Sequence, residues 1–170
     1  MSLEPKNLLK GRMAECLVEE LLKQCGNRVY RFGYEAVLQN LTQLEKAFDR
    51  ENEVGQRIKS IPDFVVINRE GKPFFVEVKF RTNLTVYSKD IKRLELIEKF
   101  WQAKIILLTP KKPYFKVSKS PYLKKREWDW VSLEEDEGLK ISKDILNQFN
   151  ELVEKYFLIE KKPKEKDLPF

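Results

Sequence analysis

The segment that decides the fold spans residues 61–80 and reads IPDFVVINREGKPFFVEVKF. Two apolar runs, 64–67 and 74–80, flank the polar segment 68–73, which contains one glycine and one proline. β-Branched and aromatic residues on both sides of a Gly/Pro turn are typical of a β-hairpin. The sequence therefore predicts two antiparallel strands joined by this turn.

Three charged residues stand in this hairpin where a buried strand is normally apolar. Asp63 precedes the first strand, and Glu77 and Lys79 interrupt the second. Residues two apart on a strand share a face, so Glu77 and Lys79 point to the same side of the sheet. Burial of such charges is costly unless they pair or bind a metal. We therefore expect Asp63, Glu77 and Lys79 to form a divalent-metal site, with a self-sufficient Glu77–Lys79 ion pair as the alternative.

The first predicted helix carries another carboxylate at a suitable position. Apolar residues within 6–25 follow a helical spacing, and Gly26-Asn27 supplies a stop signal. On that helix Glu15 lies at the margin of the apolar face. Glu15 either reaches the metal site or remains a flanking residue with its carboxylate in water.

These motifs together resemble the PD-(D/E)XK nuclease superfamily. Its motif is written here as Pro62-Asp63 followed by Glu77-Val78-Lys79. Ala14-Glu15 in the first helix and Val29-Tyr30-Arg31 in the next strand are similar to features of archaeal-type Holliday junction resolvases. The resemblance covers roughly residues 8–109.

The resemblance implies an α/β fold with a restriction endonuclease-like αβββαβ core, in which helices flank a mixed central sheet. Those resolvases pass quickly from the strand of Arg31 to the strand of Asp63, whereas this chain inserts residues 33–60. Because of the insertion, the resemblance applies to the catalytic core and leaves the substrate open.

Local patterns predict elements in the order of that core. Besides the first helix and the hairpin, they indicate a strand over 28–32, a helix from Ser88 or Asp90 to about residue 101, and a buried strand over 104–109. The strand after the helix is expected to run parallel to the second hairpin strand.

The remaining segments complete a single domain over residues 1–158. The insertion is expected to hold an amphipathic helix over 36–51 and then a mobile polar loop over 53–60. Further along, the sequence predicts an edge strand or ordered loop over 128–133, a C-terminal helix that begins at Ser142, and a disordered tail over 159–170.

The candidate site favours phosphodiester hydrolysis. Carboxylates of Asp63 and Glu77, with the backbone carbonyl of Val78, would hold Mg²⁺ or Mn²⁺ through hard oxygens. Glu15 would ligate the metal directly or through a water. Lys79 would orient or deprotonate the attacking water and offset charge in the transition state. A bound metal polarises the phosphate and lowers the pKa of the water, and the resemblance implies 5′-phosphate and 3′-hydroxyl ends.

Composition removes several other routes to hydrolysis. The 170-residue chain contains no histidine, which excludes Ser-His-Asp and Cys-His catalysis and histidine-bound zinc. Its two cysteines, Cys16 and Cys25, are too few for a zinc cage and are expected to be reduced packing residues. The chemistry is therefore left to carboxylates, lysine and a metal.

Charge and hydropathy indicate a partner and a location. The formal net charge is +6, which favours a polyanionic partner, with DNA preferred over RNA. No apolar run is long enough to span a membrane and no signal peptide is recognisable, so we expect a soluble, cytoplasmic protein without a membrane partner. Relatives that cut two strands as dimers also imply a homodimer.

A basic segment over 110–127 is the expected nucleic-acid track. It contains seven basic residues and no acidic one between residues 111 and 126, with Tyr114, Phe115 and Tyr122 placed to stack on bases. A solvated connector without a ligand is the alternative. The candidate contacts to nucleic acid across the chain are Arg31, Arg81, Lys92, Arg93, Gln102, Lys111, Lys112, Lys116, Lys119, Lys124, Lys125 and Arg126. The resemblance also implies that a polar residue of the helix after the hairpin lies at the site, and Lys92, Arg93 and Gln102 are the candidates.

The sequence therefore predicts a metal-dependent nuclease, and most specifically a DNA endonuclease. Two other functions stay open. One is a catalytically silent nucleic-acid-binding module of the same fold, which the intact trio of Asp63, Glu77 and Lys79 argues against. The other is a structural or interaction subunit that docks through the insertion and the last helix.

Overall fold

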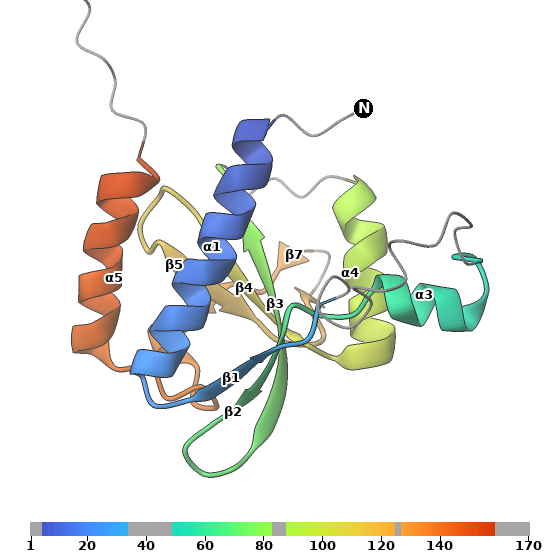
Figure 1. The fold of residues 1–170 in the computed structure, drawn as a ribbon, viewed down its shortest axis with the longest axis horizontal. Coiled ribbons are helices and arrows are strands. Elements are labelled where there is room, and N and C mark those ends of the chain that lie inside the picture. Colours follow the sequence, from blue (N-terminus) through green and yellow to red (C-terminus); the bar gives the residue numbers. More distant parts are fainter. Residues whose placement is uncertain (1–4, 34–48, 83–87, 125–126, 159–170) are drawn as a thin grey trace, which may run out of the picture.

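A six-stranded mixed sheet forms the centre of the protein (Figure 1). The computed structural model describes residues 5–33, 49–82, 88–124 and 127–158. In spatial order β1-β2-β3-β4-β5-β8, the strands are Arg28–Arg31, Phe64–Ile67, Pro73–Phe80, Lys104–Leu108, Phe115–Ser118 and Val131–Ser132. Only β3 and β4 pair in parallel, as expected, and the other neighbours in this sheet are antiparallel.

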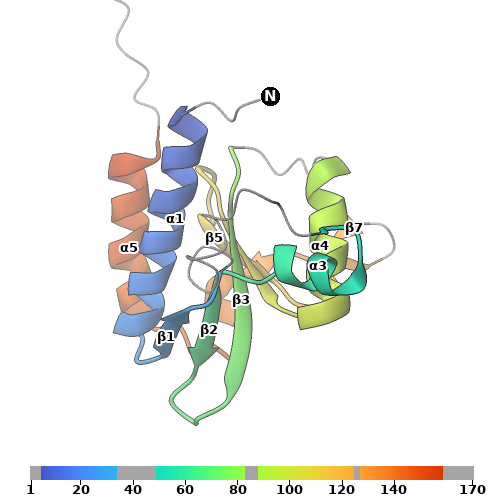
Figure 2. The same ribbon diagram turned by 45° about the vertical axis from the view of Figure 1, so that its right-hand side comes forward.

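Helices cover both faces of the sheet (Figures 1 and 2). On one face lie α1 (Pro5–Gln24) and α5 (Lys143–Tyr156), and on the other lie α3 (Glu53–Lys59) and α4 (Ser88–Trp101). The larger hydrophobic core lies under α1 and α5, and a smaller one lies under α4. The α/β class is therefore confirmed.

The hairpin predicted from residues 61–80 is confirmed, and its turn is held by one side chain. Asn68 is buried, and its Oδ1 accepts hydrogen bonds from the backbone N–H groups of Glu70 and Lys72, at 3.0 and 2.9 Å. Gly71 has a φ of +81°, which glycine adopts without strain. These contacts fix the turn, and the turn fixes the register of β2 against β3.

The first helix ends where its stop signal predicted. Gly26 has a φ of +84°, a conformation typical of helix termination by glycine. Next to it, the Asn27 side chain donates hydrogen bonds to the carbonyls of Leu22 and Leu139, at 3.1 and 2.9 Å. The end of α1 is thereby tied to the segment that leads into α5.

The loop predicted over 53–60 is wrong, because residues 53–59 form the helix α3. The Asn52 side chain caps it by accepting a hydrogen bond from the N–H of Gly55, at 2.7 Å. Gly55 is buried where the helix meets the preceding chain. The helix predicted over 36–51 lies almost entirely outside the described residues, as does the tail over 159–170.

The basic segment is part of the fold, so the alternative of a solvated connector is wrong. Its middle forms β5, and a two-stranded sheet of β6 (Leu123–Lys124) and β7 (Glu127–Trp128) follows. The aromatic residues Tyr114, Phe115 and Tyr122 are buried in the two cores. They pack the protein interior, so the prediction that they stack on bases is also wrong.

The segment over 128–133 contains the predicted edge strand, β8, followed by a short 3₁₀ helix at Leu133–Glu135. The last helix begins after Ser142, as predicted. Within the described ranges, none of the helices has the length and apolar character required to cross a membrane.

Candidate functional site

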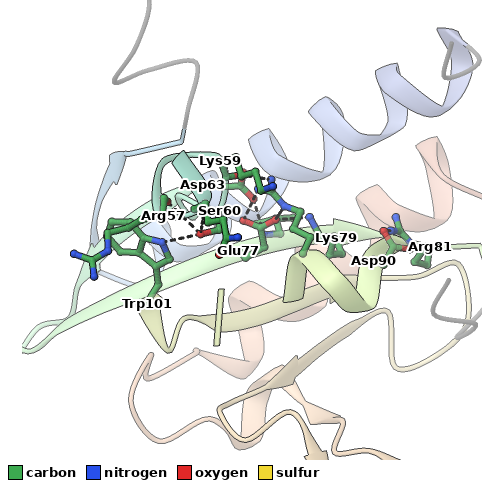
Figure 3. A network of polar contacts seen from close by, with 12 residues as sticks. Arg57, Lys59, Ser60, Asp63, Glu77, Lys79, Arg81, Asp90 and Trp101 are labelled. Carbon is green, nitrogen blue, oxygen red and sulfur yellow. Dashed lines mark hydrogen bonds and ion pairs between the residues drawn. The ribbon is translucent and has the colours of Figure 1, made fainter. Parts of the chain in front are cut away.

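The two carboxylates of the motif face each other across β2 and β3 (Figure 3). Phe64 pairs with Val76, so Asp63, one residue earlier, lies opposite Glu77, one residue later. The Asp63 carboxyl is anchored on the hairpin, since its Oδ2 accepts a hydrogen bond from the Val78 N–H at 2.7 Å. The structure thus brings Asp63 and Glu77 together as the sequence predicted.

Backbone contacts fix Asp63 from the neighbouring strand as well. Its carbonyl accepts hydrogen bonds from the N–H groups of Phe32 and Gly33, at 2.8 and 3.1 Å, directly after β1. Gly33 lies close to Asp63, because an added Cβ would be 3.6 Å from the Asp63 Cα. Both sides of β2 therefore determine where the Asp63 carboxyl sits.

Glu77 is a fully buried carboxylate held by two cations. It is 0% exposed, and its Oε1 accepts a hydrogen bond from the Lys79 ammonium. The Arg93 guanidinium of α4 donates from Nε to Oε1 at 3.1 Å and from Nη2 to Oε2 at 3.5 Å. Although burial acts to raise it, the pKa of Glu77 lies below its ordinary value because Lys79 and Arg93 favour the charged form.

Arg93 also connects the two helices on this face. Its Nη1 donates a hydrogen bond to the Lys59 carbonyl at the end of α3, at 2.9 Å. Next to that carbonyl, the buried Ser60 hydroxyl accepts a hydrogen bond from Trp101 Nε1 at 3.2 Å. Residues of α3 and α4 therefore border the site on this face of the sheet (Figure 3).

The pKa of Asp63 is shifted in the opposite direction to that of Glu77. Burial, followed by the nearby charge of Glu77, raises the pKa of Asp63 to about 7. Lys79 and the Val78 N–H act in the other direction, and Glu15 adds a further small upward effect. Glu15 of α1 is therefore close enough to interact electrostatically with Asp63, which agrees with its predicted place beside the site.

The donor atoms suit Mg²⁺ or Mn²⁺, but their present arrangement does not yet form a complete metal site. Carboxylate oxygens of Asp63 and Glu77 are the hard ligands that these ions prefer. In the part of the chain that the structure describes, no three His, Cys, Asp or Glu residues are grouped so that they could hold a metal. Both Glu77 oxygens accept hydrogen bonds from cations. A metal therefore fits only if Glu77 exchanges a partner.

The predicted nucleic-acid contacts outside the basic segment fall into different environments. Arg31 is bonded to Glu19 of α1 at 2.6 Å, and Arg81 to Asp90 of α4 at 2.6 Å. Lys92 is exposed on α4, close to Arg93 in sequence. Gln102 directly follows α4, nine residues after Arg93 and so about 13 Å further along the helix. The site thus gathers Arg93 and does not gather Gln102.

Among the side chains of the basic segment that the structure describes, Lys116 lies on the face that carries the site. Lys79 pairs with Leu107, and Leu107 pairs with Lys116, so the two lysines lie on the same side of the sheet about 10 Å apart. Lys111 and Lys119 are exposed, and Lys112 pairs with Glu154 at 3.1 Å. Lys124 lies in β6, and Lys125 and Arg126 lie outside the described residues.

Contacts that close the site were not foreseen from the sequence. The carbonyl of Lys59 and the hydroxyl of Ser60 lie at the end of α3, which was expected to be a loop, and the indole of Trp101 in α4 donates to that hydroxyl. The ion pair of Arg93 with Glu77 joins residues 16 apart in the chain. Arg93 was one of three polar candidates from this helix for the site, with Lys92 and Gln102, but the sequence did not predict its ion pair with Glu77.

Comparison of the chain with models of protein families finds no match, and comparison with curated proteins finds none either. The resemblance to PD-(D/E)XK nucleases therefore rests on the motif, the element order and the geometry of Asp63, Glu77 and Lys79.

Proposed function

We propose that this chain is a divalent-metal-dependent nuclease, and specifically a DNA endonuclease of the PD-(D/E)XK superfamily. The observation that carries the proposal is the convergence of Asp63, Glu77 and Lys79 at one point of the sheet. The order helix, strand, hairpin, helix, strand is the order of a restriction endonuclease-like core and supports the same proposal.

In this mechanism Asp63 and Glu77, helped by Glu15 and the Val78 carbonyl, would hold Mg²⁺ or Mn²⁺. When bound, such an ion polarises a phosphate and lowers the pKa of a coordinated water. The Val78 N–H keeps the Asp63 carboxyl oriented. Lys79 is the group nearest to Glu77 that can hold or accept a proton of the attacking water and offset charge on the phosphate.

One observation favours the catalytically silent nucleic-acid-binding module as a second candidate. Glu77 is neutralised by Lys79 and Arg93 without any metal. A charged group that is fully paired in this way is stable as a purely structural feature. The intact motif favours the nuclease, because a silent module has no need of both Asp63 and Lys79.

A panel of substrates separates the candidates. Supercoiled plasmid, flap, four-way junction, single-stranded DNA and RNA would each be incubated with Mg²⁺ or Mn²⁺ and the wild type, with Asp63→Asn as control. Metal-dependent cleavage of DNA by the wild type alone supports the nuclease. Binding without cleavage supports the silent module, and neither binding nor cleavage supports a structural or interaction subunit.

The same proposal includes an intracellular location. It also includes a homodimer, because a duplex is cut on two strands and most symmetric oligomers are dimers. Light scattering of the protein bound to uncleaved duplex in Ca²⁺ tests this part. A mass of two chains per duplex is the expected result, and one chain per duplex contradicts the homodimer.

A further inference from the structure

The Arg93 guanidinium occupies the carboxylate of Glu77, which the proposed function assigns to the metal. It contacts both oxygens of Glu77, from Nε and from Nη2, and Lys79 contacts Oε1 as well. The Glu77 side chain is 0% exposed. A cation that approaches Glu77 therefore meets a carboxylate that already has two positive partners, and the electrostatic field there opposes further positive charge.

We propose that Arg93 is an internal competitor of the metal ion, so that Glu77 binds a divalent cation only as the Arg93 guanidinium leaves it. This inference rests on the proposed function, since it takes Asp63 and Glu77 as the metal ligands. It assigns Arg93 a positioning role toward Glu77 in the metal-free state, which differs from the contact to nucleic acid expected from the sequence.

Arg93, and not Lys79, is the partner that can leave. The Arg93 side chain is 39% exposed, whereas that of Lys79 is 19% exposed. Lys79 stands two residues from Glu77 on the same strand and shares its face, so it stays beside Glu77 in any rotamer change of Arg93. Arg93 comes from a separate element, α4, and its long side chain can extend into solvent.

The contact of Arg93 with α3 gives the exchange a structural consequence. In the metal-free state, Nη1 of Arg93 bonds the Lys59 carbonyl. A guanidinium that leaves Glu77 loses the geometry that serves both bonds, so the Lys59 carbonyl at the end of α3 loses this partner at the same time. Metal binding is thereby coupled to a local change at α3, and the coupling is reciprocal because both cations compete for one carboxylate.

Titration of the full-length chain with Mn²⁺ alone tests the competition, with free Mn²⁺ followed by electron paramagnetic resonance at pH 8. Wild type would be compared with Arg93→Gln and with Lys99→Gln, which removes an exposed positive charge from the same helix, α4. We expect Arg93→Gln to bind Mn²⁺ roughly 5- to 150-fold more tightly than wild type, the usual range of coupling between two sites. Lys99→Gln should bind nearly as wild type does.

The outcomes distinguish this inference from the proposed function. If wild type binds Mn²⁺ and folded Arg93→Gln binds it no more tightly than Lys99→Gln does, the competition is overturned and the metal site stands. If neither wild type nor Arg93→Gln binds Mn²⁺, both are overturned.

A second measurement on the wild type covers the case in which Arg93→Gln fails to fold. The Arg93 Nε–H donates to Glu77 at 3.1 Å, so its proton should exchange slowly with water in the metal-free protein. Nitrogen-15 NMR should show this exchange accelerate on addition of Mg²⁺, with the signal assigned through Arg93→Lys. A signal that stays protected while Mg²⁺ is bound would overturn the competition.

Discussion

Asp63 and Glu77 lie opposite each other, yet their surroundings push their pKa values in opposite directions. Burial and the charge of Glu77 raise the pKa of Asp63 to about 7. Despite its own burial, Glu77 keeps a lowered pKa because Lys79 and Arg93 stabilise its charge. Asp63 is therefore the carboxyl of this pair that changes protonation near neutral pH.

This difference predicts how stability depends on pH. The folded-state pKa of Asp63, about 7, exceeds its ordinary value of 3.8. The contribution of Asp63 to the free energy of unfolding is therefore fully present below pH 3.8 and is lost as pH rises through 7. We expect the free energy of unfolding of the metal-free protein to be roughly 2 to 3 kcal/mol lower at pH 8 than at pH 5 because of this group. Urea unfolding at the two pH values measures it.

Asp63→Asn provides the control for this pH dependence, because asparagine imitates the protonated carboxyl. The variant should lose most of the difference between pH 5 and pH 8. Glu77 does not confuse the comparison, since a lowered pKa acts only below its ordinary value of 4.5. An Asp63→Asn protein with the full pH dependence of the wild type would contradict the assignment.

At the residue scale, the sequence predicted positions that depend on local register, whereas it named Arg93 only as one of three polar candidates on its helix and did not predict the bond to Glu77. Asp63 meets Glu77 because a short hairpin turn sets which residues face each other. Arg93 reaches Glu77 because of how α4 is rotated and placed on the sheet. Helix rotation of this kind follows from packing of the whole face, and no short motif records it.

Among the elements, α3 matters most for the site and was the least predictable. It is short and mostly polar, with only Val54 and Ile58 as large apolar residues, so periodicity could not identify it. The hairpin, α4, β4 and α5 were predictable because each has a clear apolar pattern with turn or cap residues at its ends. β5 was not predicted because Lys116 stands among many other basic residues of the segment 110–127, although buried Phe115 and Val117 flank it.

Two glycine substitutions test how tightly α3 is built into the structure. A Cβ at Gly55 would lie 2.0 Å from the Asp49 carbonyl oxygen, so Gly55→Ala should destabilise the protein by about 1 to 3 kcal/mol. A Cβ at Gly11 of α1 would meet nothing within 4 Å, so Gly11→Ala should stabilise it by about 0.5 to 1 kcal/mol.

Urea unfolding of the two variants measures both effects. Because α3 supplies the Lys59 carbonyl to Arg93, Gly55→Ala should also expose Arg93 to solvent. Equal stability of Gly55→Ala and wild type would show that the junction before α3 is not packed as described.

For the whole molecule, the site, α4 and Lys116 share one face of the sheet, while α1 and α5 cover the other. A nucleic acid that reaches Lys79 would pass near Lys116 and far from α5. We expect Lys116→Gln to reduce the slope of log affinity against log salt for duplex DNA by about one. Lys155→Gln on α5 should leave the slope unchanged.

Fluorescence anisotropy of labelled duplex DNA in Ca²⁺, over a range of salt concentrations, measures these slopes. If Lys155→Gln lowers the slope and Lys116→Gln does not, DNA uses the other face of the molecule. That result would also separate DNA binding from the carboxylate site.

The central claim is that Asp63, Glu77 and Lys79 form one phosphodiester-cleaving site. The most direct test is the single-turnover cleavage rate, with Mn²⁺, on the DNA substrate that the wild type cuts best. Asp63→Asn and Lys79→Gln should each lose at least about 100-fold in rate while they remain folded. Lys72→Gln, in the exposed hairpin turn, should cut as the wild type does. Cleavage at the wild-type rate by folded Asp63→Asn or folded Lys79→Gln would contradict the account.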